Sequence, residues 1–164
     1  MGEKVKTIEG LEEYASSLLE IHLRSNMISE IHGFLCLPHI IHLELYDNQV
    51  TSLDGINILP SLVILDVSFN EIRNIPDLSA CTELTEVYIA NNKINTIEGL
   101  CGLTKLRKLD LGANRIRVIE HLDGLGTLTE LWLGKNKIEQ VQGLSTLLHL
   151  EKLSIQVNAK GPRV

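Results

Sequence analysis

The chain has 164 residues, of which 44% are hydrophobic and 22% charged, a balance typical of one soluble folded domain. Its net charge of −6 at pH 7 argues against a nucleic-acid partner, because proteins that bind phosphate backbones need clustered lysine and arginine. No apolar stretch approaches the roughly 20 residues of a membrane helix, so we expect no membrane association and favour a basic protein surface as the partner.

Residues 1–17 precede the regular part of the sequence, and we expect them to form an N-terminal capping segment. Leu11, Tyr14, Ala15 and Leu18 are spaced at i, i+3, i+4 and i+7, which predicts a short amphipathic helix. Such a helix would cover the apolar end of the first structural unit, as the cap of a repeat protein must.

Residues 18–157 contain a strict 22-residue repeat with the pattern L-x-x-L-x-L-x-x-N-x-I, in which isoleucine or valine can replace leucine. Six copies follow one another without an insertion, and a partial seventh begins at Leu150; the first copy is Leu18, Ile21, Leu23, Asn26 and Ile28. Self-similarity at this period predicts a solenoid in which each unit contacts only its neighbours. The pattern resembles that of leucine-rich repeats.

Each repeat contains an L-x-L segment, which predicts a short β-strand with leucines pointing inward and the residue between them pointing outward. The fold class we expect is therefore an α/β solenoid, a leucine-rich-repeat right-handed superhelix. Short parallel strands should line its concave face, and 3₁₀ or short helical turns its convex face. The asparagine after each strand can both donate and accept hydrogen bonds, which predicts a buried ladder of Asn26, Asn48, Asn70, Asn92, Asn114, Asn136 and Asn158.

Residues 158–164 leave the pattern and are expected to form an irregular tail. Lys160 stands where an apolar residue is required, and Gly161 and Pro162 end regular structure. We expect the last coil to expose an apolar end and an unpaired strand edge, which natural proteins avoid. Self-association through this uncapped C-terminal coil, a fragment and a splice product are the three explanations that the sequence leaves open.

The outward positions of successive strands form columns, and the middle one is the most distinctive. This central column reads His22, Glu44, Asp66, Tyr88, Asp110, Trp132 and Ser154. From Asp66 to Trp132 it alternates acidic and aromatic residues, which is typical of a binding hot spot. Gly112 and Gly134 beside Trp132 should leave room for a partner side chain. The alternative interpretation is a solvated surface without function, because such positions are polar by default.

No catalytic, metal or cofactor site is predicted, and we do not expect an enzyme. The sequence contains no phosphate-binding loop, nucleophile elbow or H-E-x-x-H zinc motif. His22 and His42 fall on adjacent strands, but in different columns and without a third metal ligand that the spacing reveals. The three cysteines, Cys36, Cys81 and Cys101, show no disulfide or zinc spacing and favour a reducing compartment.

Several segments, in the same order and register, resemble the subunit 7 type of leucine-rich-repeat regulatory subunit of protein phosphatase 1. They lie at residues 44–49, 64–70, 74–75, 91–94, 111–117 and 133–138, and the resemblance covers about residues 18–157. It implies a regulatory subunit that binds the phosphatase catalytic subunit through its concave face, in the nucleus and cytoplasm. The implied contacts are Asp66, Tyr88, Asp110 and Trp132, and Glu44 keeps the acidic character of the family at its position.

The chain departs from this family in one respect, because the family carries more repeats and a C-terminal cap. A partial interface or a different partner would follow from that difference. The alternative functions are a cytoskeletal or flagellar adaptor and a ribonucleoprotein adaptor that binds a protein, both known among proteins with the same 22-residue repeat.

Overall fold

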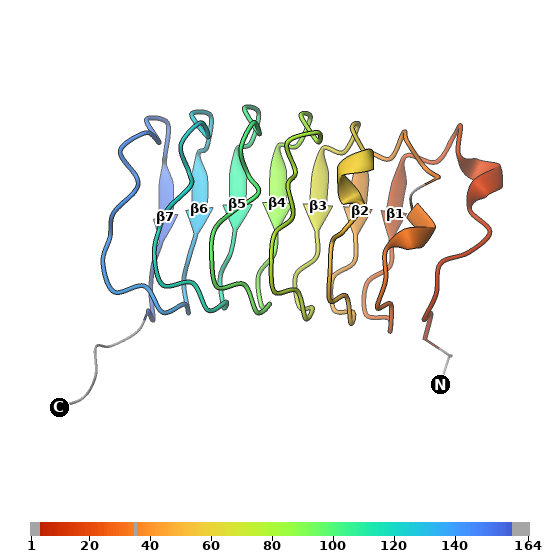
Figure 1. Cartoon of the computed structure of the whole chain (residues 1–164), viewed down its shortest axis with the longest axis horizontal. Helices are drawn as coiled ribbons and strands as arrows, with labels where there is room; N and C mark the ends of the chain where they lie inside the picture. Colours follow the sequence, from red (N-terminus) through yellow and green to blue (C-terminus); the bar gives the residue numbers. More distant parts are fainter. Residues whose placement is uncertain (1–3, 35, 159–164) are drawn as a thin grey trace.

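A computed structural model describes residues 4–34 and 36–158, which form a row of stacked coils (Figure 1). Seven coils each contribute one three-residue strand, and the strands form a single parallel sheet in chain order. The strands are β1 (Glu20–His22), β2 (His42–Glu44), β3 (Ile64–Asp66), β4 (Glu86–Tyr88), β5 (Lys108–Asp110), β6 (Glu130–Trp132) and β7 (Lys152–Ser154). The expected solenoid of short parallel strands is confirmed.

The register of the sheet equals the length of the repeat. Leu43 pairs with Leu65, and Leu109 pairs with Leu131, each 22 residues further along the chain. The middle residue of each strand from β1 to β6 therefore points into the solenoid and is buried. Burying one such aliphatic side chain stabilises a fold by roughly 1.5–3 kcal/mol, so the repeated pattern holds the coils together.

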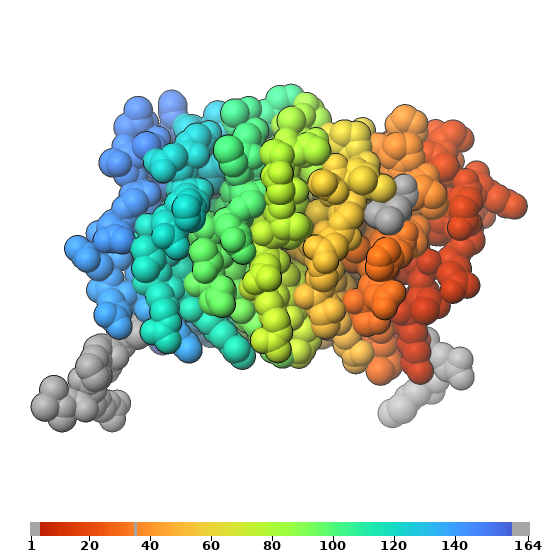
Figure 2. Space-filling model, in the orientation of Figure 1, coloured from red at the N-terminus to blue at the C-terminus, as the bar shows by residue number. Residues whose placement is uncertain are grey.

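The return segments opposite the strands bury a second set of apolar side chains. Figure 2 shows the outer surface of the stacked coils, which follow one another in chain order. Two of the return segments contain 3₁₀ helices, η2 (His32–Phe34) and η3 (Ile56–Ile58). In later coils a single hydrogen-bonded turn takes the place of the 3₁₀ helix. In one of these turns the Cys81 N–H donates to the Leu78 carbonyl at 2.8 Å. Cys81 is fully buried there, and burial, with a smaller contribution from Asp77, raises the pKa of its thiol to about 11.

The predicted asparagine ladder is present, with two exceptions to its burial. Asn114 is a representative member: its Oδ1 accepts from the Ile94 N–H at 2.9 Å, and its Nδ2 donates to the Ile89 carbonyl at 2.9 Å. Each asparagine thus joins its own coil to the preceding one. The five interior members are buried, whereas Asn26 and Asn158 are partly exposed, because each occupies an end coil of the described residues.

The amino-terminal segment differs from the helix expected there. It forms a 3₁₀ helix of three residues, η1 (Glu12–Tyr14), and the Tyr14 side chain is exposed. The helix is short because, of the four apolar residues, only Leu11, Ala15 and Leu18 pack against the core. Their contact is too small to stabilise further helical turns. Residues before η1 form a partial coil instead: the Val5 N–H donates to Asn26 Oδ1 at 3.0 Å, one residue out of step with the other ladder contacts.

At the other end, the last described coil exposes several apolar side chains, as expected. Leu148, Val141 and Val157 are exposed on it, and β7 pairs only with β6 among the described residues. The predicted breaks at Lys160, Gly161 and Pro162 lie outside the described residues. No helix in the described part of the chain is long and apolar enough to cross a membrane.

Candidate functional site

The central column lies on one surface of the sheet, which we call the strand face. Asp66 pairs with Tyr88, Tyr88 with Asp110 and Asp110 with Trp132 across three consecutive strand pairs. At about 4.8 Å per strand, these four residues form a strip about 14 Å long. Trp132 is 39% exposed and the other three are partly exposed, so the strip is accessible from outside. The side chains expected to share one face therefore do so.

The two aspartates of this strip are held by the backbone rather than by cations. The Ser68 N–H donates to Asp66 Oδ1 at 2.9 Å, and the Gly112 N–H donates to Asp110 Oδ1 at 2.8 Å. Burial raises the pKa of Asp110 despite the Gly112 hydrogen bond, and repulsion from Asp66 adds to the rise. Neither carboxylate forms an ion pair within residues 4–34 and 36–158, so their negative charge is uncompensated there.

The lysines on the strand face form ion pairs with glutamates and not with these aspartates. Lys108 pairs with Glu86 at 3.1 Å, and Lys152 pairs with Glu130 at 2.9 Å, so both cations are already engaged. Burial tends to raise the pKa of Glu86, but hydrogen bonds from Tyr88 and Lys108 outweigh it and the net pKa is lowered. The Tyr88 hydroxyl donates to Glu86 at 2.6 Å. Burial first, and then this carboxylate, raises the pKa of the phenol.

A shallow hollow of about 190 Å³ opens beside Trp132. Its lining includes Asp110, Gly112, Trp132, Gly134, Ser154 and Gln156. The two glycines keep it open, because a Cβ at Gly112 would lie 3.1 Å from Asp110 Oδ1 and one at Gly134 would lie 3.3 Å from the Gln156 carbonyl oxygen. An indole, a carboxylate and exposed backbone thus meet in one depression, where a partner side chain could be received.

Glu44 behaves differently from the other acids of the central column. It accepts a hydrogen bond from His22 Nδ1 at 2.9 Å and forms an ion pair with Arg24 at 2.8 Å. Burial tends to raise the pKa of Glu44, but His22 and Arg24 together lower it. The guanidinium of Arg24 also lies 4.3 Å from the centre of the Tyr46 ring. The resemblance implied only an acidic residue at Glu44, and the structure shows that its carboxylate is already paired with His22 and Arg24.

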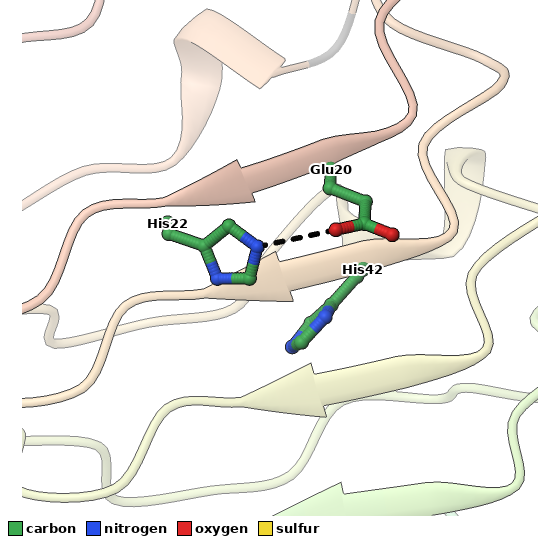
Figure 3. Close-up of side chains that lie close together, drawn as sticks. All are labelled: Glu20, His22 and His42. Atoms are coloured by element: carbon green, nitrogen blue, oxygen red, sulfur yellow. Dashed lines mark hydrogen bonds and ion pairs between the residues drawn. The ribbon is translucent and has the colours of Figure 1, made fainter.

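The strand face also holds a group of potential metal ligands that the sequence reading missed. Glu20 on β1 lies beside His22, and His42 on β2 completes the group, with one ligand atom from each within 4.8 Å of the others (Figure 3). Glu20 is thus a third candidate ligand that the sequence analysis did not identify. Glu20 and His22 are two apart on one strand, and Glu20 and His42 pair directly across two strands. This combination of same-strand and cross-strand neighbours was available from the register.

Comparison with known proteins places the repeat in a family. Residues 60–116 match the family described as leucine rich repeat, and residues 38–80 match that described as leucine rich repeats (2 copies). No curated protein matches the whole sequence significantly.

Solved structures with the same fold include two bacterial internalins. An internalin C2 from Listeria monocytogenes is 31% identical with a TM-score of 0.85, over 92% of this chain and 66% of that one. An internalin F from the same organism has a TM-score of 0.79 at 24% identity, over 91% of this chain and 51% of that one, which supports the fold alone. The chain thus spans less than two thirds of either structure. The repeat pattern, the stacked coils and these matches show a leucine-rich-repeat solenoid fold, and the two family models together match residues 38–116.

Proposed function

We propose that the strand face is a protein-binding surface and that its partner is the catalytic subunit of protein phosphatase 1. Leucine-rich-repeat proteins act as protein-interaction scaffolds. The observation that carries the proposal is the continuous strip of Asp66, Tyr88, Asp110 and Trp132, in which two uncompensated carboxylates alternate with two aromatic rings. Asp66 lies within one of the segments that resemble the phosphatase regulatory subunits, and Tyr88, Asp110 and Trp132 lie one to three residues before the segments that begin at residues 91, 111 and 133.

The chemistry of the strip specifies what a partner surface must offer. Lysine or arginine side chains would pair with Asp66 and Asp110, which have no cation of their own among the described residues. An apolar pocket or ring would cover the exposed face of Trp132, and a small side chain would enter the hollow beside it. Buried aromatic anchors surrounded by charges provide most of the binding free energy in many interfaces. The proposal assigns no catalytic step and no cofactor to this chain.

Binding of the purified phosphatase catalytic subunit to the immobilised chain tests the proposal. We expect the wild type to bind and Trp132→Ala with Asp110→Ala to bind at least tenfold more weakly, because a hot-spot residue contributes about 2 kcal/mol or more. The matched control is Tyr14→Ala with Asp123→Ala, which removes an exposed aromatic and an exposed acid away from the strand face.

Two results would contradict this proposal. Absence of binding by the wild type would exclude the phosphatase and would favour a cytoskeletal, flagellar or ribonucleoprotein partner. Equal loss in both double variants would show that the strand face has no special role. For the whole protein we propose a nuclear and cytoplasmic location, which fluorescence microscopy of the tagged chain would test.

We also propose that the exposed apolar coil near β7 allows two copies to associate. Leu148 is 84% exposed and Val141 60% exposed, more than most of the large hydrophobic side chains among the described residues. Sedimentation velocity should show a concentration-dependent dimer that Leu148→Ser with Val141→Ser abolishes. A monomer at every concentration would exclude this contact.

A further inference from the structure

The N-terminal end of the strand face carries a cluster of ligands distinct from the acidic and aromatic strip. His22 Nε2 lies 3.4 Å from Glu20 Oε2, and the rings of His22 and His42 meet edge to face with centroids 4.6 Å apart. All three side chains rise from the paired strands β1 and β2 (Figure 3). Because the two strands are hydrogen-bonded to each other, the sheet holds the three Cα atoms in fixed positions relative to one another.

A fourth residue fixes which nitrogen of His22 is available. Its Nδ1 lies 2.9 Å from Glu44 Oε2, and Arg24 holds the other oxygen of the same carboxylate at 2.8–2.9 Å. When the ring is neutral, as metal binding requires, the ionised carboxylate of Glu44 favours the tautomer in which Nδ1 carries the hydrogen. The lone pair then resides on Nε2, on the side of the ring that faces Glu20. Histidines that bind metals commonly donate their other N–H to a carboxylate in this way.

We propose that Glu20, His22 and His42 form a surface site for a divalent transition-metal ion such as Zn²⁺. Two imidazole nitrogens and one carboxylate oxygen are the donors that Zn²⁺ accepts in sites with an open position. With Zn–N bonds of about 2.0–2.1 Å, tetrahedral ligands stand roughly 3.3 Å apart. Glu20 and His22 already have that separation, and the remaining ligand atoms, within 4.8 Å, need only side-chain rotation.

The local charge suits a divalent cation. Glu20 provides one negative charge directly, and Glu44 provides a second one behind His22, where Arg24 balances it. A bound ion would replace the weak contact between Glu20 and His22 and would leave a coordination position open toward solvent. Water or a side chain of a binding partner would fill that position. The site does not depend on the identity of the protein partner proposed above.

Calorimetric titration of the metal-free chain with zinc chloride at pH 7.5 tests the site. We expect one equivalent to bind, and either His22→Ala or His42→Ala to weaken binding by more than about tenfold. The Glu44→Gln variant keeps all three ligands and should weaken binding by about tenfold, the usual effect of losing an outer-shell carboxylate. The control, His32→Ala with His149→Ala, removes two exposed histidines outside the cluster and should bind as the wild type does.

Co²⁺ separates this site from an adventitious thiol site at the exposed Cys101. Binding by nitrogen and oxygen ligands gives cobalt absorption without a sulfur charge-transfer band, and the paramagnetic ion should broaden the ring signals of His22 and His42 first. A sulfur band, or affinity that survives loss of both histidines, would overturn the proposal. Equal broadening of all six histidines would also overturn it.

Discussion

Asp110 accepts a hydrogen bond from the N–H of Gly112 at 2.8 Å, and this is the only hydrogen bond that its side chain makes among the described residues. The carboxylate is partly buried, and burial raises its pKa. A charge held in this environment lowers the stability of the fold, so its presence in the centre of the strand face is better explained by binding than by folding.

The Asp110→Asn variant should therefore be more stable than the wild type at pH 7. Asparagine keeps the oxygen that accepts from Gly112 but removes the charge that is poorly solvated there. Because the folded-state pKa of Asp110 lies above its unfolded value, the penalty is present at neutral pH and disappears as the pH falls below both values. Thermal unfolding of both proteins at pH 7 and at pH 3.5 should show a gap in Tm that closes in acid.

Binding and stability should move in opposite directions in this variant. The same Asp110→Asn substitution should weaken binding to the proposed phosphatase partner while raising the Tm. An exposed carboxylate elsewhere, changed as Asp123→Asn, should alter neither. A lower Tm for Asp110→Asn at pH 7 would show that the carboxylate stabilises the fold, contrary to this interpretation.

The ladder contributes more stability than any surface pair. Asn114→Ala should lower the free energy of unfolding by about 3 kcal/mol or more, because it leaves the Ile94 N–H and the Ile89 and Leu111 carbonyls buried with fewer or no partners. Urea unfolding would measure the loss. The exposed Asn74, changed to alanine, should cost less than about 0.5 kcal/mol. Similar losses at both positions would mean that the ladder adds little.

The repeat itself made much of this architecture predictable. A 22-residue period without insertions sets the register between strands, and the register decides that Asp66, Tyr88, Asp110 and Trp132 share a face. Leucine alternation separates inward from outward positions by the geometry of a strand alone. The asparagine ladder follows for the same reason, since a regular coil leaves the same backbone groups unpaired in every turn.

Hydrogen-bond partners on the surface were less predictable, because periodicity fixes where a side chain starts and not where its end lies. Glu44 could have faced solvent, yet His22 and Arg24 both turn toward it. Glu20 and His42 lie in one column and His22 in the next, so the group of three was missed because the two columns were considered separately. The prediction of an amino-terminal helix was wrong because helical spacing stabilises a helix only where every apolar residue can pack against a surface. Tyr14 packs against no such surface and is exposed.

His22 offers a test of the contact with Glu44. The hydrogen bond that His22 donates to Glu44, followed by the one that it donates to Glu20, raises the pKa of His22 above its ordinary value of 6.5. The stabilisation by these contacts is therefore fully present below that value and is lost as the pH rises through the higher folded-state pKa. Titration of the histidine ring signals by NMR should show His22 at a lower pKa in Glu44→Gln than in the wild type. No change would mean that the contact is absent in solution.

Each ladder asparagine follows a residue whose backbone lies in the left-handed region. Ala113 precedes Asn114 and has a φ of 53°, a conformation that costs a residue with a Cβ about 1 kcal/mol and costs glycine little. Ala113→Gly should therefore raise the free energy of unfolding by up to about 1 kcal/mol, after the greater freedom of the unfolded chain is subtracted. Ala80 has no positive φ, so Ala80→Gly should lower it by about 0.4–1 kcal/mol through greater freedom of the unfolded chain. Chemical denaturation of the two variants would compare them, and the opposite signs expected from the same substitution separate backbone strain from any general effect of glycine.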